Sequence, residues 1–238
     1  MPVPLSSRNS IKPFNYTINL NPYIELAIYL LSFLIPIITG VKRYTSFDKA
    51  TRLILYVAIV SFVIELIALY TEIKYRNNLP IYNIASVIYL LLLGLYFSKI
   101  ITLFNTAAFR KLYSIAILLI WIATLFYEKS LLVLNSAFMI IVGIVVICFS
   151  ILSIDNIVAV QSKRYFKLTT SIHFWFAVVF LFYWCITILQ WGLYKYFSEK
   201  ISGYEYINLA LSLVSTLVNI AFGMLFYNYP KLKQADAS

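Results

Sequence analysis

The chain has 238 residues, of which 62% are hydrophobic and 12% are charged. Soluble domains contain about 45–50% apolar and about 25% charged residues, so this composition excludes an ordinary soluble protein. A net charge of +10 would suggest a nucleic-acid partner in a soluble domain, but here the Lys and Arg residues lie between apolar runs. That distribution favours membrane topology over nucleic-acid binding.

The chain begins with a polar, proline-containing stretch, residues 1–20, which has no continuous apolar core. It predicts an exposed tail rather than a cleaved signal peptide. Seven apolar runs follow, each about long enough to cross about 30 Å of hydrocarbon at 1.5 Å per residue. Because these runs are continuously apolar rather than alternating, helices are favoured over barrel strands. The predicted spans are Tyr23–Gly40, Leu53–Tyr70, Ile81–Phe97, Leu112–Tyr127, Leu131–Leu152, Phe174–Trp191 and Ile207–Tyr227.

The sequence therefore predicts an all-α, polytopic membrane protein with one seven-helix transmembrane domain at residues 21–228 and a cytoplasmic tail at 229–238. The fourth run is the shortest. If it did not cross the membrane, every later link would lie on the opposite side of the membrane from the one predicted here. Lys and Arg residues number seven on the amino-terminal side and twelve on the other. The positive-inside rule then places the amino terminus outside and the carboxyl terminus in the cytoplasm. The links are too short for a soluble catalytic domain.

An acid lies inside the second span, in "SFVIELIALYTE". An ionised carboxylate in hydrocarbon costs at least about 2.5 kcal/mol, so Glu65 should face the bundle. It is either a ligand contact or proton site, or a neutral group bonded to a neighbouring helix. Glu72 lies on nearly the same helix face, about 10.5 Å nearer the outer rim. With Glu25 these acids would form an outward-facing funnel for a cation or amine; the alternative for Glu25 and Glu72 is a solvated rim charge.

Polar residues also recur in the seventh span, where "NLALSLVSTLVN" places Asn208, Ser212, Ser215 and Asn219 on one face. That face should point into the bundle rather than to lipid. Deep aromatic residues in other spans, such as Tyr89, Trp121, Tyr183 and Trp184, fit either helix packing or a pocket lining. The predicted ligand-binding or proton-site residues are Glu65, Glu72, Tyr89, Gln190 and Asn208.

The sequence contains one histidine, His173, at the start of the sixth span. Without Cys, Asp or Glu at ligand spacing it predicts no metal site, and an interfacial position is expected. Asp155 and Asn156 are expected to cap the fifth span or to pair with Lys163 and Arg164. No nucleotide-binding, hydrolase or metalloprotease motif occurs, and the seventh span has no Lys for a retinal Schiff base. We therefore expect no metal, no cofactor and no enzymatic activity.

Three segments resemble a poorly characterised group of bacterial seven-transmembrane-helix proteins, often encoded near two-component signalling genes. They are "NNLPIYNIASVIYLLLLGLYF", "FWFAVVFLFYWCITILQW" and "INLALSLVSTLVNIAFGMLFY". The resemblance implies a sensory or accessory role in the bacterial inner membrane, with no catalytic residues to transfer. Related chains often carry an acid after the Pro-x-Tyr element of the third span, where this chain has "YNIASVIYLL".

Two classes of function fit these features. The first is a sensory or receptor-like protein that binds a small ligand or senses the membrane, and signals to a cytoplasmic partner. The alternative is a channel, transporter or oligomeric membrane effector with a polar path lined by Glu65 and the seventh helix. The expected partners are the lipid bilayer, a small-molecule ligand, a cytoplasmic signalling protein and a second copy of the chain, with no nucleic acid.

Overall fold

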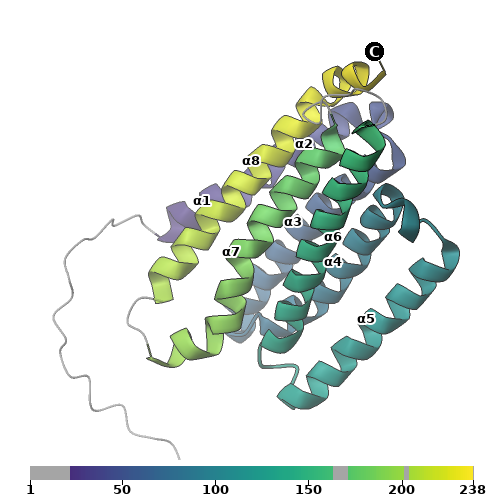
Figure 1. The fold of residues 1–238 in the computed structure, drawn as a ribbon. Helices are drawn as coiled ribbons and strands as arrows, with labels where there is room; N and C mark the ends of the chain where they lie inside the picture. Colours follow the sequence, from purple (N-terminus) through teal and green to yellow (C-terminus); the bar gives the residue numbers. More distant parts are fainter. Residues whose placement is uncertain (1–21, 163–170, 201–203, 238) are drawn as a thin grey trace, which may run out of the picture.

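The computed structural model is entirely helical over the residues it describes, 22–162, 171–200 and 204–237 (Figure 1). Within these ranges, seven helical segments are long and apolar enough to cross a membrane, as the sequence predicts, the fourth among them. The expected tail at residues 1–20 lies outside the described part. The helices are α1 (Pro22–Ser32), α2 (Leu34–Arg43), α3 (Lys49–Tyr75), α4 (Leu79–Ile100), α5 (Ala107–Glu128), α6 (Ser136–Ser162), α7 (Ile172–Lys200) and α8 (Tyr204–Ala237), with 3₁₀ turns at Tyr44–Ser46 and Thr102–Phe104.

The first span is broken at Phe33 into α1 and α2, whereas the sequence predicts one helix. Pro36 has no N–H, so the carbonyl of Ser32 loses its donor four residues later. The Ser32 hydroxyl donates to the carbonyl of Tyr29 at 2.6 Å and accepts from Asn219 Nδ2 at 2.8 Å. Next to the break, Ser32 and Asn219 thus form a buried polar contact between α1 and α8.

Six of the spans form a ring in which each packs against the next, in the order α2, α3, α4, α6, α7 and α8, and α8 packs back against α1 and α2. The remaining span, α5, lies outside the ring against α4 and α6 (Figure 1). Its attachment depends on Tyr113, whose hydroxyl donates to the carbonyl of Leu90 at 2.9 Å. A Cβ at Gly94 would overlap the Tyr113 ring, so this glycine makes the close approach of α5 to α4 possible.

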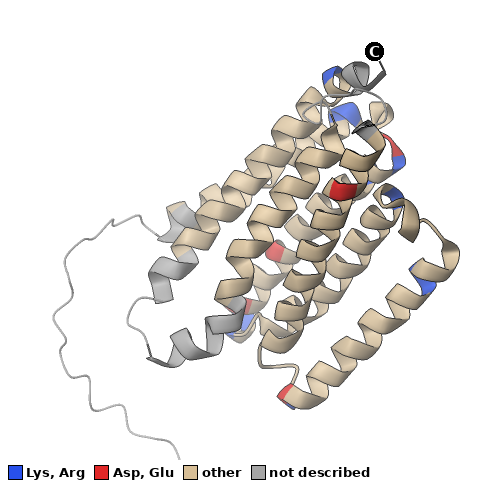
Figure 2. Ribbon diagram, viewed as in Figure 1, with Lys and Arg blue, Asp and Glu red and all other residues tan. Residues whose placement is uncertain are grey.

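The two ends of the bundle are named here by residues at the two ends of α3. At the Asp48 end α3 begins and α4 ends; at the Arg76 end α3 ends and α4 begins. Figure 2 shows that charged residues gather near these ends and that most of each helix carries none. This segregation is what a helix that crosses hydrocarbon requires.

Toward the Asp48 end the ring is filled by aromatic side chains, each no more than 4% exposed. Neighbouring rings lie close, with centroids 5.1 Å apart for Tyr96 and Phe97 and 5.3 Å for Phe180 and Phe222. We call this group the aromatic core. Its members are Tyr96, Phe97, Phe176, Phe180, Phe222 and Phe226.

Most helices extend past the ends of the predicted spans, whereas the fifth span begins at Ser136 rather than at Leu131. α8 continues to Ala237 past the boundary at residue 228, and Tyr229, only 2% exposed, packs on Phe47 with ring centroids 4.9 Å apart. α6 continues to Ser162, so Asn156 does not cap its end and the prediction of capping is wrong; Lys163 and Arg164, the alternative partners, lie outside the described residues. Asn156 instead donates to the carbonyl of Ile100 at 3.0 Å and tethers the end of α4.

Candidate functional site

Two adjoining cavities lie inside the ring. The chamber, with a volume of about 160 Å³, is lined by residues from α1, α3, α4, α6, α7 and α8. The vestibule, about 560 Å³, lies nearer the Arg76 end, and its lining includes Glu72, Arg76 and Gln190. Both cavities are lined by Tyr29, Glu65, Tyr82, Tyr183, Thr187 and Ser215. Glu65 therefore lies where the chamber meets the vestibule.

The Glu65 carboxylate is held by tyrosine hydroxyls from two other helices. Tyr82, on α4, donates to Oε2 at 3.0 Å, and Tyr29, on α1, makes a second hydrogen bond. In the described part of the chain the one salt-bridge contact joins His173 to Asp48, so Glu65 has no cationic partner there. The prediction that Glu65 faces the bundle is thus confirmed, and its neighbours are neutral donors.

Aromatic residues make up eight of the 21 that line the chamber. Its aromatic lining residues are Tyr29, Phe33, Tyr82, Tyr89, Phe180, Tyr183, Trp184 and Phe222. Ser61 and Ser215, which lie beside Tyr89 and Tyr183, line the chamber as well. Because the face of an aromatic ring attracts cations, a carboxylate surrounded by such rings forms an electrostatically negative site.

The chamber has a polar end and an apolar end. Glu65 and its tyrosines lie beside the vestibule, whereas Phe180 and Phe222 of the aromatic core line the chamber as well. Met139 and Val142 add apolar surface from α6. The packed aromatic core therefore forms the floor of the chamber on the side of the Asp48 end.

The vestibule carries charges of both signs. Glu72 is exposed and lines it together with Arg76, which ends α3 in a left-handed conformation with φ of 56°. Asn77, beside it, accepts from the Leu79 N–H at 3.0 Å and donates to the carbonyl of Leu132 at 3.2 Å. Glu65 and Glu72 do line one cavity, as expected of a funnel, but Arg76 offsets part of its charge. The side chain of Glu25 lies outside the described residues.

The structure brings together four of the five predicted site residues. Tyr89 lines the chamber, Glu72 and Gln190 line the vestibule, and Glu65 lines both. The side chain of Asn208 lies outside the described residues. The sequence also predicts that Asn208 shares an inward polar face of the seventh span with three other residues. For those three the inward orientation is confirmed, since Ser212 lines the vestibule, Asn219 lines the chamber and Ser215 lines both.

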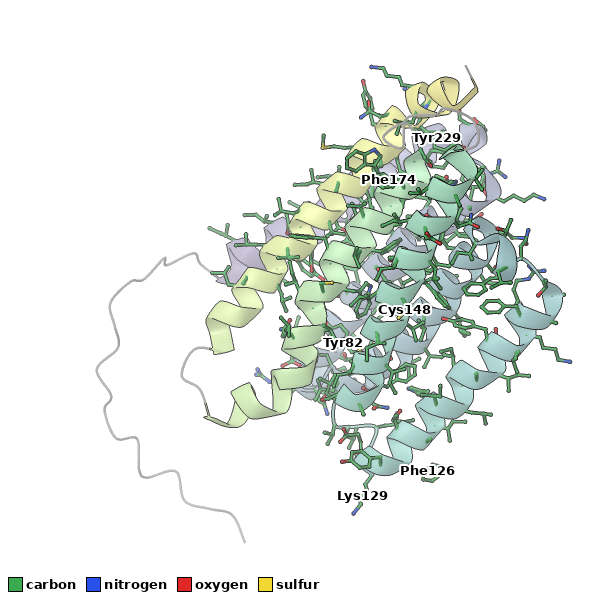
Figure 3. All side chains as sticks on the ribbon, viewed as in Figure 1. Tyr82, Phe126, Lys129, Cys148, Phe174 and Tyr229 are labelled. Atoms are coloured by element: carbon green, nitrogen blue, oxygen red, sulfur yellow. The ribbon has the colours of Figure 1, made fainter. Side chains whose placement is uncertain are left out.

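Sequence reasoning missed the tyrosines that bind Glu65. Tyr82 lies next to the start of the predicted span Ile81–Phe97, a position typical of an interfacial tyrosine. Figure 3 shows it near one end of the bundle, with Tyr229 near the other. Tyr82 could have been found from the sequence because a carboxylate inside the membrane, such as Glu65, needs a hydrogen-bond donor at the same depth on a neighbouring helix. Of the deep aromatics, Tyr183 and Trp184 line the chamber, whereas Trp121 is a packing residue whose Nε1 donates to the carbonyl of Asn83 at 3.1 Å.

A second polar cluster closes the Asp48 end. His173 Nε2 lies 3.0 Å from Asp48 Oδ2, which also accepts from the Tyr229 hydroxyl at 3.2 Å, and Tyr96 Oη lies 3.4 Å from His173 Nδ1. Asp48 caps α3 by accepting from the Thr51 N–H at 2.6 Å. Burial raises the pKa of Asp48, but hydrogen bonds from His173 and Thr51 outweigh it, so this pKa lies below its ordinary value. We call these residues the latch; it joins α3, α4, α7 and α8.

The fold and the cavities define the class of protein: over the described residues it is a helical bundle with seven segments long and apolar enough to cross a membrane, as in a multi-pass membrane protein, and a chamber with one carboxylate lies inside the helix ring. No group of three or more His, Cys, Asp or Glu side chains in the described ranges could hold a metal ion. Comparison of the chain with protein-family models, curated proteins and solved structures gives no match.

Proposed function

We propose that this protein is a receptor-like membrane protein that binds a small ligand in the chamber and signals to a cytoplasmic partner. The observation that carries the proposal is Glu65, a carboxylate at mid-helix that faces a cavity and has only hydroxyl partners in the described structure. An ionisable group at membrane depth is costly and marks a functional site by default. A cavity with a few convergent polar groups is the usual form of a ligand site.

The distribution of basic residues gives the proposed orientation. In the sequence, the links predicted on one side of the membrane, which include the one that contains Asp48, carry twelve Lys and Arg residues, and those predicted on the other side carry seven. By the positive-inside rule the Asp48 end faces the cytoplasm and the amino terminus lies outside. A ligand then reaches the chamber through the vestibule from the outer side, consistent with the resemblance to bacterial inner-membrane proteins of sensory type.

The latch offers a route for the signal because its helices also line the chamber. α3 carries Glu65 and begins beside Asp48, and α7 carries Tyr183 and begins beside His173. A ligand that binds two packings of these helices with different affinity shifts their populations. Helix shifts of about 1–2 Å are typical of such transitions and are enough to break a hydrogen bond at the latch.

The alternative is a channel or transporter whose polar path is lined by Glu65 and α8. Ser212, Ser215 and Asn219 favour it, because they continue the polar lining along α8. The aromatic core opposes it, because its rings pack tightly across the ring between the chamber and the Asp48 end. A path through the bundle would require these rings to separate.

Flux measurements in proteoliposomes test the two functions against each other. Vesicles that contain the protein and a trapped pH-sensitive dye should show no more K⁺ or H⁺ flux than protein-free vesicles. Flux that disappears in Glu65→Gln, but persists in the control Asp155→Asn on the exposed face of α6, would establish the alternative. Both changes convert a carboxylate to an amide, so they are matched in charge.

A further inference from the structure

From the chemistry of the chamber we infer the class of ligand: an organic ammonium ion with a single positive charge and an apolar body about the size of one aromatic ring. This inference rests on the proposed function, since it concerns the same site. Three independent features of the chamber support it, which are its charge, its aromatic walls and its volume.

The charge of the site calls for a cation. Glu65 is the acid that lines the chamber, and the described residues supply it with hydroxyl donors but no salt bridge. A carboxylate in a low-dielectric site is stabilised most by a positive charge in direct contact. An ammonium group in the chamber can donate to the Glu65 oxygen atoms while Tyr82 keeps its own hydrogen bond.

The walls favour an organic cation over a metal ion. Ca²⁺ takes six to eight oxygen ligands, carboxylates among them, and Mg²⁺ an octahedral set, whereas the chamber has one carboxylate. Its other side-chain oxygen atoms belong to neutral hydroxyls and to the Asn219 amide, and eight of its lining residues are aromatic. Aromatic rings stabilise ammonium groups through their negative faces, and cages of such rings recognise alkylammonium ligands. Tyr29, Tyr82 and Tyr183 come from three helices and line the junction where Glu65 lies.

The volume sets the size of the apolar body. A chamber of about 160 Å³ is close to the roughly 150 Å³ of an apolar cavity that holds one benzene molecule. Its floor is formed by Phe180 and Phe222, which suit a ring in edge-to-face contact. The ligand therefore lies with its ammonium group at Glu65 and its ring toward the aromatic core.

The probe for this inference is 2-phenylethylamine, which carries one ammonium group two carbons from one ring. Binding to the protein in lipid nanodiscs at pH 7 is followed by calorimetry and by Trp fluorescence, since Trp184 lines the chamber. We expect saturable binding that weakens at least about tenfold in Glu65→Gln, because loss of one partner of a desolvated charge pair is costly. The control Asp155→Asn should bind like the wild type, and 2-phenylethanol, which lacks the charge, should bind at least about tenfold more weakly.

A second variant keeps the test decisive if Glu65→Gln does not fold. Ser61→Phe keeps the carboxylate but fills the chamber one turn away on α3, so it should lose binding of 2-phenylethylamine. Wild-type affinity in this variant would overturn the assigned position of the ring.

The remaining outcomes separate the inferred class from the proposed function. Equal binding of 2-phenylethanol and 2-phenylethylamine, unchanged in Glu65→Gln, would leave a ligand site but overturn an ammonium ligand. Binding of Na⁺ or K⁺ that depends on Glu65, with no binding of the amine, would likewise overturn the ligand class alone. If folded wild-type protein binds none of these probes, the inferred ligand class is overturned, whereas the proposed function is overturned separately, by Glu65-dependent flux in the proteoliposomes.

Discussion

Asn83 provides the sharpest test of how the structure is held together. Its side chain is fully buried, and its amide nitrogen donates to the carbonyls of Leu131 and Val133 at 2.9 and 2.8 Å. Its amide oxygen accepts from the Asn135 N–H at 2.9 Å. These three bonds fasten the α5–α6 connection to α4, so Asn83→Leu removes all of them while it roughly preserves volume.

The magnitude follows from these bonds. Each of the three bonds contributes about 1 kcal/mol net, so Asn83→Leu should lower the free energy of unfolding by about 3 kcal/mol. For a chain of this size that corresponds to a fall in Tm of about 6–12 °C. The assay is thermal unfolding in detergent micelles, monitored by tryptophan fluorescence. Trp121 reports on the surroundings of Asn83, because its Nε1 donates to the Asn83 carbonyl.

A matched control separates this effect from a general cost of changing asparagine. Asn228→Leu alters a partly exposed side chain on α8 whose amide donates within its own helix, to the carbonyl of Met224, and should change stability by no more than about 0.5 kcal/mol. A Tm for Asn83→Leu within 2 °C of wild type, roughly the effect of 0.5 kcal/mol, would refute the assigned role of these bonds.

Three other changes test further contacts by thermal unfolding. Gly94→Ala should cost about 1–3 kcal/mol because its Cβ overlaps the Tyr113 ring, and the loss should shrink when combined with Tyr113→Ala; equal losses in both backgrounds would contradict this. Asn219→Ala should cost about 0.6–1.7 kcal/mol through its lost contact with α1, and an unchanged Tm would count against that contact. Because the pKa of Asp48 is lower in the folded state than in the unfolded state, its ionised carboxylate stabilises the fold at pH values above the unfolded-state pKa of about 3.9. This contribution to stability is lost as the pH falls through the folded-state pKa. Between pH 6 and pH 3 the Tm of Asp48→Asn should therefore fall less than that of wild type, and parallel curves would rule out the role of the bond to His173.

Much of the fold could be predicted from the sequence because the cost of burying charge in hydrocarbon acts on each segment separately. The seven spans follow from this local rule, as does the inward position of Glu65. The break at Phe33 depends on Pro36, which the sequence displays, but a proline near the start of a helix can be tolerated without a break. The helical continuation to Ala237 was missed because residues after 228 become polar and basic, as a tail would.

The sequence by itself determined that this is a helical membrane protein, how many spans it has, and that one carboxylate lies where hydrocarbon would penalise it. These properties depend on the composition of single segments. Only the tertiary structure decided which side chains surround Glu65 and that Asp48 pairs with His173, 125 residues away. Those pairings depend on the order of the helices around the ring and on their relative depth. The spans have similar apolar surfaces, so the residues of one span do not show which other spans it packs against or at what depth.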